Sequence, residues 1–288
     1  MKMKKKSNKI PFLATVSPAI IWLILFLVLP LLYIVGISFM KKGLYGGVIQ
    51  TFDLTAYKTM FQSKYMKILL DSLWLSLKTT GLCLLFGYPF AYIISNTKKK
   101  WKPFCVLLIM LPFWINSLIR TYGWNSILRE QGILNTLLMQ LGIIKQPLQM
   151  LYTDGAALLG MVYALIPFTV LPLYSSIEKL DHSLLEAASD LGASKVHVFR
   201  KVILPLTMPG IFAASVQTFI PSLGYFFITD MMGGATTMNI GNVIKNQFLT
   251  ARNWPLGAAL AIALIAVTIV IMRLYTRVGS IEDMVKEE

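Results

Sequence analysis

Six stretches of the chain run long enough without charged residues to cross a bilayer, which takes about 20 mostly apolar residues. These stretches are residues 11–40, 79–97, 103–119, 155–177, 202–229 and 253–272. We expect the second span to begin earlier, near Leu69, and therefore to cover residues 68–97 with Asp71 and Lys78 close to its first turns. The pattern predicts an all-α polytopic membrane protein with six transmembrane helices.

A seventh uncharged segment, residues 131–144, is too short to span a bilayer. Its apolar residues recur at helical spacing: Leu134, Leu137, Leu138, Leu141 and Ile144. This spacing predicts an amphipathic helix that lies on the outer surface of the membrane. The pattern also allows a helix that packs against the outer ends of the spans.

The composition supports a membrane protein and excludes several other classes. Hydrophobic residues make up 56% of the chain and charged residues 14%, whereas soluble domains have roughly 45–50% and about 25%. A water-soluble globule and a disordered nucleic-acid-binding arm are both excluded by this balance. Cys83 and Cys105 stand alone in apolar stretches, so no disulfide framework, metal site or catalytic nucleophile is visible, and we predict no enzyme activity and no cofactor on this chain.

Lysine and arginine are distributed unevenly between the loops, which predicts the orientation. The net charge is +14, and more of the basic residues fall on one side when residues 1–10 are placed in the cytoplasm. This bias predicts that both termini are cytoplasmic. The first apolar run is far longer than the core of a signal peptide, so we expect an uncleaved first span. The short loops leave no room for a nucleotide-binding fold.

The predicted cytoplasmic loop, residues 178–201, contains the clearest local signals. Ser183 followed by Glu186 has the spacing of a capping box, which predicts a helix that begins there. That helix is expected to run through Leu191 and to end at Gly192 in a left-handed cap. Ser194 is expected to begin a second helix, and Pro205 to mark the entry into the membrane.

This loop resembles the EAA loop of ABC importer permeases. The matching positions are Glu186, Ala187, Ala188, Gly192, Val202, Leu204 and Pro205, with Val202 where isoleucine is usual. The resemblance implies that the helix docks into a cleft on a separate ATPase subunit, which would hold the ATP and Mg²⁺. From the residues alone, Glu186 has an alternative role as a cap of its own helix, with the alanines as good helix formers.

A wider resemblance covers nearly the whole chain and is to the permeases of spermidine/putrescine importers. It is carried by residues 87–91, 111–120, 122–123, 172–181, 206–210, 228–234, 240–244 and 247–248. It implies the type I (MetI-like) permease fold over residues 68–272, in a bacterial cell membrane. The implied partners are membrane lipids, a second homologous permease, a pair of ATPase subunits and an extracytoplasmic polyamine-binding protein, with no nucleic acid.

A polycationic substrate favours carboxylates, carbonyl oxygens and aromatic faces along its path. The candidate residues are Trp114, Asn116, Tyr225, Asp230 and Asp71. The aromatic members have an alternative role in interfacial or helix packing, and Asp71 has one as a partner of a helix dipole. The first rival hypothesis is an ABC importer permease for another small solute. An ion-driven secondary transporter is the second, and it predicts paired carboxylates at mid-membrane, where charges are almost absent.

Overall fold

The computed structural model describes residues 9–234 and 237–285. The chain divides into two compact units. Unit 1 comprises Met1–Gln62 and Asn246–Leu264, and unit 2 comprises Ser63–Lys245 and Ile265–Glu288. Two helices, α14 (Ile240–Leu249) and α15 (Trp254–Val285), contribute to both units.

Unit 1 begins with a long apolar helical run. Its parts are α1 (Lys9–Leu23), the π-helical turn η1 (Ile24–Val28) and α2 (Leu29–Ser38). The π turn directly precedes Pro30, which has no N–H to donate and crowds the carbonyl one turn before it. One wider turn relieves that clash without ending the helix.

A short hairpin follows α2 and is the one departure from an all-helical chain among the described residues. Strand β1 (Met40–Lys42) pairs antiparallel with β2 (Val48–Phe52), with Lys42 opposite Val48. The connecting turn uses Gly46 and Gly47 at φ of 93° and 77°, where other residues are strained. The helix α3 (Thr55–Met60) follows, and the Tyr57 ring stacks on that of Phe39 with centroids 5.0 Å apart.

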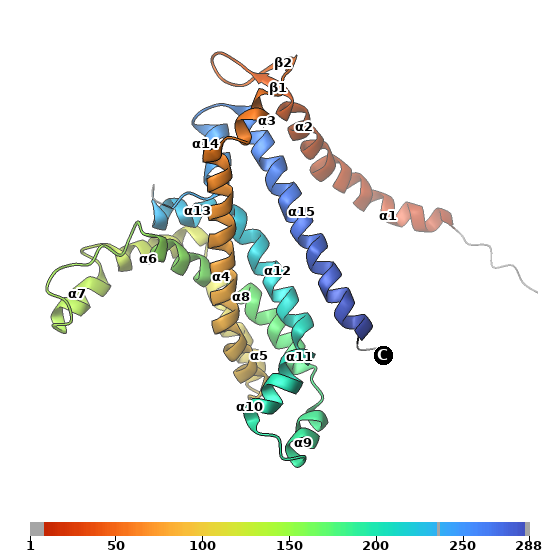
Figure 1. Ribbon diagram of the computed structural model, residues 1–288, viewed down its shortest axis with the longest axis vertical. Helices are drawn as coiled ribbons and strands as arrows, with labels where there is room; N and C mark the ends of the chain where they lie inside the picture. The colour runs from red at the N-terminus through yellow and green to blue at the C-terminus, as the bar shows by residue number, and fades with distance from the viewer. Residues whose placement is uncertain (1–8, 235–236, 286–288) are drawn as a thin grey trace, which may run out of the picture. The chain divides into compact units, whose positions relative to one another are not determined.

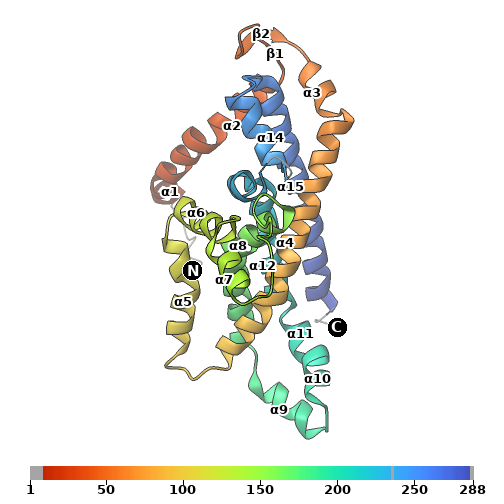
Figure 2. The same ribbon diagram turned by 90° about the vertical axis from the view of Figure 1, so that its left-hand side faces the viewer.

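The centre of unit 2 is a group of three long helices, α4 (Ser63–Ser95), α8 (Asp154–Glu178) and α12 (Met208–Gly224). They lie side by side in both views (Figures 1 and 2). Small residues let them approach closely, as at Gly87 of α4, where an added Cβ would meet the Thr169 methyl at 3.2 Å. Such small contact residues are typical of helix packing in membranes, where the burial of apolar side chains does not drive helices to associate because lipid tails are equally apolar.

The remaining elements of unit 2 are shorter. They are α5 (Lys102–Trp114), α6 (Ser117–Leu128), α7 (Ile133–Gln140), α9 (His182–Asp190), α10 (Lys195–Val198), η2 (Phe199–Ile203), α11 (Leu204–Leu206), α13 (Phe226–Ile228) and η3 (Thr229–Gly233). The start of α5 is joined to the end of α8 by an ion pair between Lys102 and Glu178 at 2.8 Å.

Within the described residues, four helices are long and apolar enough to cross a membrane: Val16–Ser38, Ser63–Ser95, Asp154–Glu178 and Trp254–Tyr275. Two further spans arise if each of two bent helix pairs is counted as one. The first pair, Lys102–Trp114 with Ser117–Gln140, bends by 88°, and the second, Lys195–Leu206 with Met208–Gly224, bends by 64°. The predicted spans 103–119 and 202–229 are therefore not straight helices. The first breaks at Ile115 and Asn116, and the second at Thr207 and again at Tyr225.

Candidate coupling helix and translocation path

Helix α9 begins earlier than the capping-box spacing predicts. The N-cap is Asp181, whose carboxylate accepts the backbone N–H of Ser183 at 2.9 Å. The prediction of Ser183 as the cap was wrong because Asp181, two residues before it, is an equally good acceptor and reaches the first free N–H groups. Glu186 is thereby released from capping, and its side chain is exposed.

The other end of α9 closes as the sequence predicts. Gly192 has a φ of +79°, its N–H donates to the Ser189 carbonyl at 2.9 Å, and the Ala193 N–H donates to the Ala188 carbonyl at 3.1 Å. This pair of bonds is a Schellman motif, which satisfies the last carbonyls of the helix. The predicted second helix is also present, since the Ser194 hydroxyl accepts the His197 N–H at the start of α10.

Helix α9 stands at one end of the bundle, below α8 and α12 in Figures 1 and 2. Glu186 and Ala187 are exposed, and Ala188 is half-buried. Leu184 and Leu191 are also exposed, to 47% and 89%.

Buried contacts connect α9 to the long helices. Leu204 and Pro205 lie in α11, which ends at Thr207 where the chain bends into α12. Thr207 is fully buried, and its hydroxyl lies 2.9 Å from that of Tyr88 on α4. The Tyr88 ring also meets Phe199 edge-on at 5.7 Å. These contacts join η2 and the bend at Thr207 to α4.

Two of the predicted path residues come together where spans three and five are broken. Asn116 caps α6, its side chain accepting the Leu118 N–H at 2.8 Å. Tyr225 separates α12 from α13, and its hydroxyl lies 3.2 Å from that of Ser117. Asn116 and Tyr225 line one pocket of about 310 Å³. Trp114, two residues before Asn116, is 72% exposed.

Asp230 lies one turn beyond Tyr225 and is paired within the chain. Its carboxylate accepts hydrogen bonds from the ammonium group of Lys245 and from the side-chain amide of Asn242. The same ammonium group lies 5.6 Å from the centroid of the Phe226 ring. The Lys245 ammonium group thus lies between a carboxylate and an aromatic face, and Asp230 is still 34% exposed.

A buried network that the sequence analysis did not identify holds this ion pair in place. The Asn242 amide oxygen accepts from the Thr229 hydroxyl at 2.7 Å and from the Asn239 N–H at 2.9 Å. The Ile240 N–H donates to the Ser72 hydroxyl of α4 at 2.7 Å. Asn239, Asn242, Thr229 and Ser72 are each at most 2% exposed. The sequence signals were Ser72 inside the predicted second span and the resemblance over residues 240–244, which include Asn242.

Asp71 is not part of this arrangement. Its side chain is exposed on α4, next to Ser72, and it does not line the pocket that contains Asn116 and Tyr225. Asp71 is therefore the weakest of the five candidates.

The chain is similar to proteins of known family. The family model for the binding-protein-dependent transport system inner membrane component matches residues 84–280. The chain is 46% identical over 256 residues to the spermidine/putrescine transport system permease protein PotB of Escherichia coli (strain K12), covering 89% of this chain and 93% of that protein. It is 43% identical over 281 residues to PotB of Haemophilus influenzae, covering 97% of each.

Solved structures share the fold at low sequence identity. A bacterial ABC transporter involved in the import of the acidic polysaccharide alginate matches with a TM-score of 0.74 at 20% identity, covering 93% of this chain and 94% of that one. A chain of the MetNI methionine ABC transporter matches with a TM-score of 0.57 at 16% identity, covering 77% and 99%. These matches confirm the predicted permease fold.

Proposed function

The chain belongs to the family of binding-protein-dependent transport system inner membrane components, and on that premise we propose that it carries spermidine and putrescine inward. It is a multi-pass membrane protein and the permease subunit of an ABC importer. The observation that most favours the substrate is the identity of 43–46% to relatives named as spermidine/putrescine permeases, over 89–97% of this chain.

The proposed coupling element is α9 with its flanking residues. Glu186, Ala187 and Ala188 would enter a cleft on an ATPase subunit, and the rigid cap at Gly192 would keep the helix from deforming under load. Leu204 and Pro205, in the short helix that joins Thr207, would pass the motion to α4 and α12. ATP and Mg²⁺ would bind to the partner ATPase. In this arrangement α9 and both termini face the cytoplasm, as the basic loops predict.

The proposed path runs past the two helix breaks. Asn116, Tyr225 and Trp114 supply an amide oxygen, a phenol and an aromatic face, which suit a polyamine ammonium group. Asp230 supplies the carboxylate, which the Lys245 ammonium group occupies in this structure. A passing substrate ammonium would take the place of Lys245 at Asp230, and the displaced Lys245 ammonium group, whose side chain is 28% exposed, would then be solvated by water.

The proposal implies a heteromeric assembly. A second homologous permease would complete the path, two ATPase subunits would bind the α9 helices, and an extracytoplasmic binding protein would deliver the polyamine. One solved relative is an alginate transporter in complex with a pentasaccharide-bound periplasmic protein. The outer segments of this chain, including α7, would face that delivery protein.

Uptake by the purified assembly in proteoliposomes tests the proposal. With binding protein outside and ATP inside, we expect uptake of radiolabelled spermidine and putrescine and none of a neutral sugar. Uptake of another solute but not of polyamines would overturn the substrate. Polyamine uptake that follows an ion gradient without ATP would overturn the importer class.

A further inference from the structure

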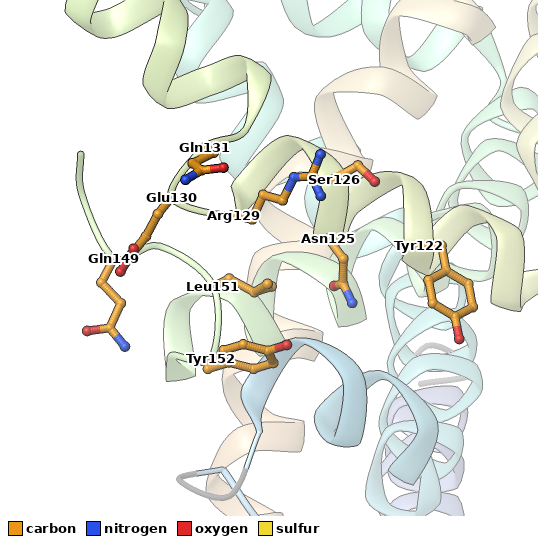
Figure 3. A pocket seen from close by; sticks show the side chains of 9 residues that line it. All are labelled: Tyr122, Asn125, Ser126, Arg129, Glu130, Gln131, Gln149, Leu151 and Tyr152. Carbon is orange, nitrogen blue, oxygen red and sulfur yellow. The ribbon is translucent and has the colours of Figure 1, made fainter.

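A second cavity on unit 2 has none of the five candidate path residues in its lining. It has a volume of about 520 Å³ and is formed by the end of α6, the loop after it and the segment before α8. Figure 3 shows the side chains that line it. The cavity contains a neighbouring cation and anion, Arg129 and Glu130, and three side-chain amides, Asn125, Gln131 and Gln149.

The cavity adjoins the start of a candidate membrane span. Leu151 and Tyr152 line it and directly precede α8, which is a candidate span from Asp154. The helices α6 and α7 leave α5 at 88°, so they run along the membrane surface if α5 crosses it. Ile133 and Leu141 at the two ends of α7 are exposed to 62% and 70%, as on a helix that rests in the interface.

The walls of the cavity are fixed by hydrogen bonds to the backbone of η3. The Tyr152 N–H donates to the Met232 carbonyl at 2.8 Å and holds Tyr152 at a φ of +61°, which L residues rarely adopt. The Asn125 amide nitrogen donates to the Met231 carbonyl at 3.2 Å. This bond fixes the orientation of the amide, whose buried oxygen has no hydrogen-bond partner among the described residues.

The two charges are available to a ligand. In the part of the chain that the structure describes, the ion pairs join Lys102 to Glu178 and Lys245 to Asp230, and neither involves Arg129 or Glu130. Figure 3 shows the two side chains extending in opposite directions. A ligand with an anion and an ammonium group can therefore meet one at each side of the cavity.

We propose that this cavity binds the headgroup of a phospholipid that carries a primary ammonium group, as in phosphatidylethanolamine. Arg129 contacts the phosphate, for which a guanidinium fork is suited. Glu130 and the amide oxygen of Gln149 accept hydrogen bonds from the ammonium group. The site depends on the membrane boundary and does not depend on the identity of the transported solute.

Lipid retention by the assembled importer tests this site. The assembly is reconstituted in nanodiscs of phosphatidylethanolamine or phosphatidylcholine and then released from them. Native mass spectrometry measures how many lipid molecules stay bound to it. Because the choline group has no N–H to donate, we expect about tenfold greater retention of phosphatidylethanolamine. Equal retention of the two lipids by the unaltered protein contradicts the proposal and requires no variant.

Three substitutions assign the contacts. Glu130→Gln should abolish the preference between the two lipids, and Arg129→Gln should lower the retention of both. Lys145→Gln, an exposed cation that does not line the cavity, is the matched control and should change neither. The proposal is overturned if Glu130→Gln and Arg129→Gln retain both lipids as the unaltered protein does. It is also overturned if these variants lose affinity for the binding protein while their lipid retention stays intact.

Discussion

The hydroxyl groups of Thr169 on α8 and Thr218 on α12 lie 2.6 Å apart, and both side chains are fully buried. Each hydroxyl also lies within hydrogen-bond distance of a carbonyl of its own helix, Leu165 at 3.4 Å from Thr169 and Ala214 at 2.8 Å from Thr218, so either can be the donor between them. The bond joins two of the three central helices where both side chains are buried. Its geometry requires the register that brings the two threonines face to face.

A double-mutant cycle on these threonines measures that bond. Thr169→Val and Thr218→Val each keep the side-chain shape and remove the hydroxyl. We expect a coupling free energy of about 0.6 kcal/mol, the average for interhelical hydrogen bonds in membranes, and no more than about 1.7 kcal/mol. Denaturation in mixed detergent micelles gives the free energies of unfolding. Strictly additive effects would show that the two hydroxyls do not interact.

Close packing of α12 on α8 predicts a steric effect at Gly210. A Cβ added there would lie 2.3 Å from the Cβ of Ser176, next to the α8 backbone. We expect Gly210→Ala to destabilise the protein by about 1–3 kcal/mol, the usual cost of overpacking. The control is Gly81→Ala in α4, where nothing lies within 4 Å, and it should be neutral or stabilising by about 0.4–1 kcal/mol. The same denaturation assay compares them, and equal effects would argue against the contact.

The cap of the coupling helix makes a conformational prediction. At Gly192, with φ of +79°, a β-branched residue is strongly strained, whereas asparagine adopts this region more readily. We expect Gly192→Val to lower ATP-driven uptake about tenfold and Gly192→Asn to retain most of it. An added Cβ meets nothing within 4 Å, so the difference would come from the backbone alone. Similar uptake in the two variants would show that coupling does not depend on the left-handed cap at Gly192.

The Asp230–Lys245 pair makes a prediction about the path. Asp230→Asn and Lys245→Gln both break the ion pair, so a purely structural role predicts equal effects on uptake. If Asp230 also contacts the polyamine, Asp230→Asn should raise the KM for uptake by about tenfold more than Lys245→Gln, since it removes a charged hydrogen bond to the substrate. Initial rates of uptake, measured over a range of polyamine concentrations with the binding protein at a saturating concentration, give the KM of each variant. Equal KM values would place Asp230 outside the path.

The sequence predicted the helical class and the cap at Gly192 because both depend on local patterns. Apolar runs follow from the thickness of the bilayer, and glycine is the residue that most readily enters a left-handed cap. Pro221 and Gly224 predicted a local loosening of span five, where the helix breaks at Tyr225. The break at Ile115 was not predicted, because an uncharged run has the same composition whether its helix is straight or bent.

The environment of Asp230 also could not be read from the sequence. Its partner, Lys245, lies fifteen positions along the chain, between the predicted spans 202–229 and 253–272. The pair forms because Asn242 and Asn239 fold the intervening segment against η3, and Ser72 ties it to α4. The resemblance to polyamine permeases pointed to residues 240–244, although no contact could be assigned to them from composition or spacing.

The coupling of α9 to a nucleotide-hydrolysing partner is tested most directly by photocrosslinking at Ala187, which is exposed on that helix. A photoreactive phenylalanine analogue is placed at position 187 in the intact assembly, and at the exposed Ile143 beyond α7 as the control. The account predicts that position 187 crosslinks to the ATPase subunit, with a yield that changes when ATP is added, and that position 143 does not. Crosslinking of position 187 only to lipid, or to a protein on the opposite side of the membrane, would contradict it.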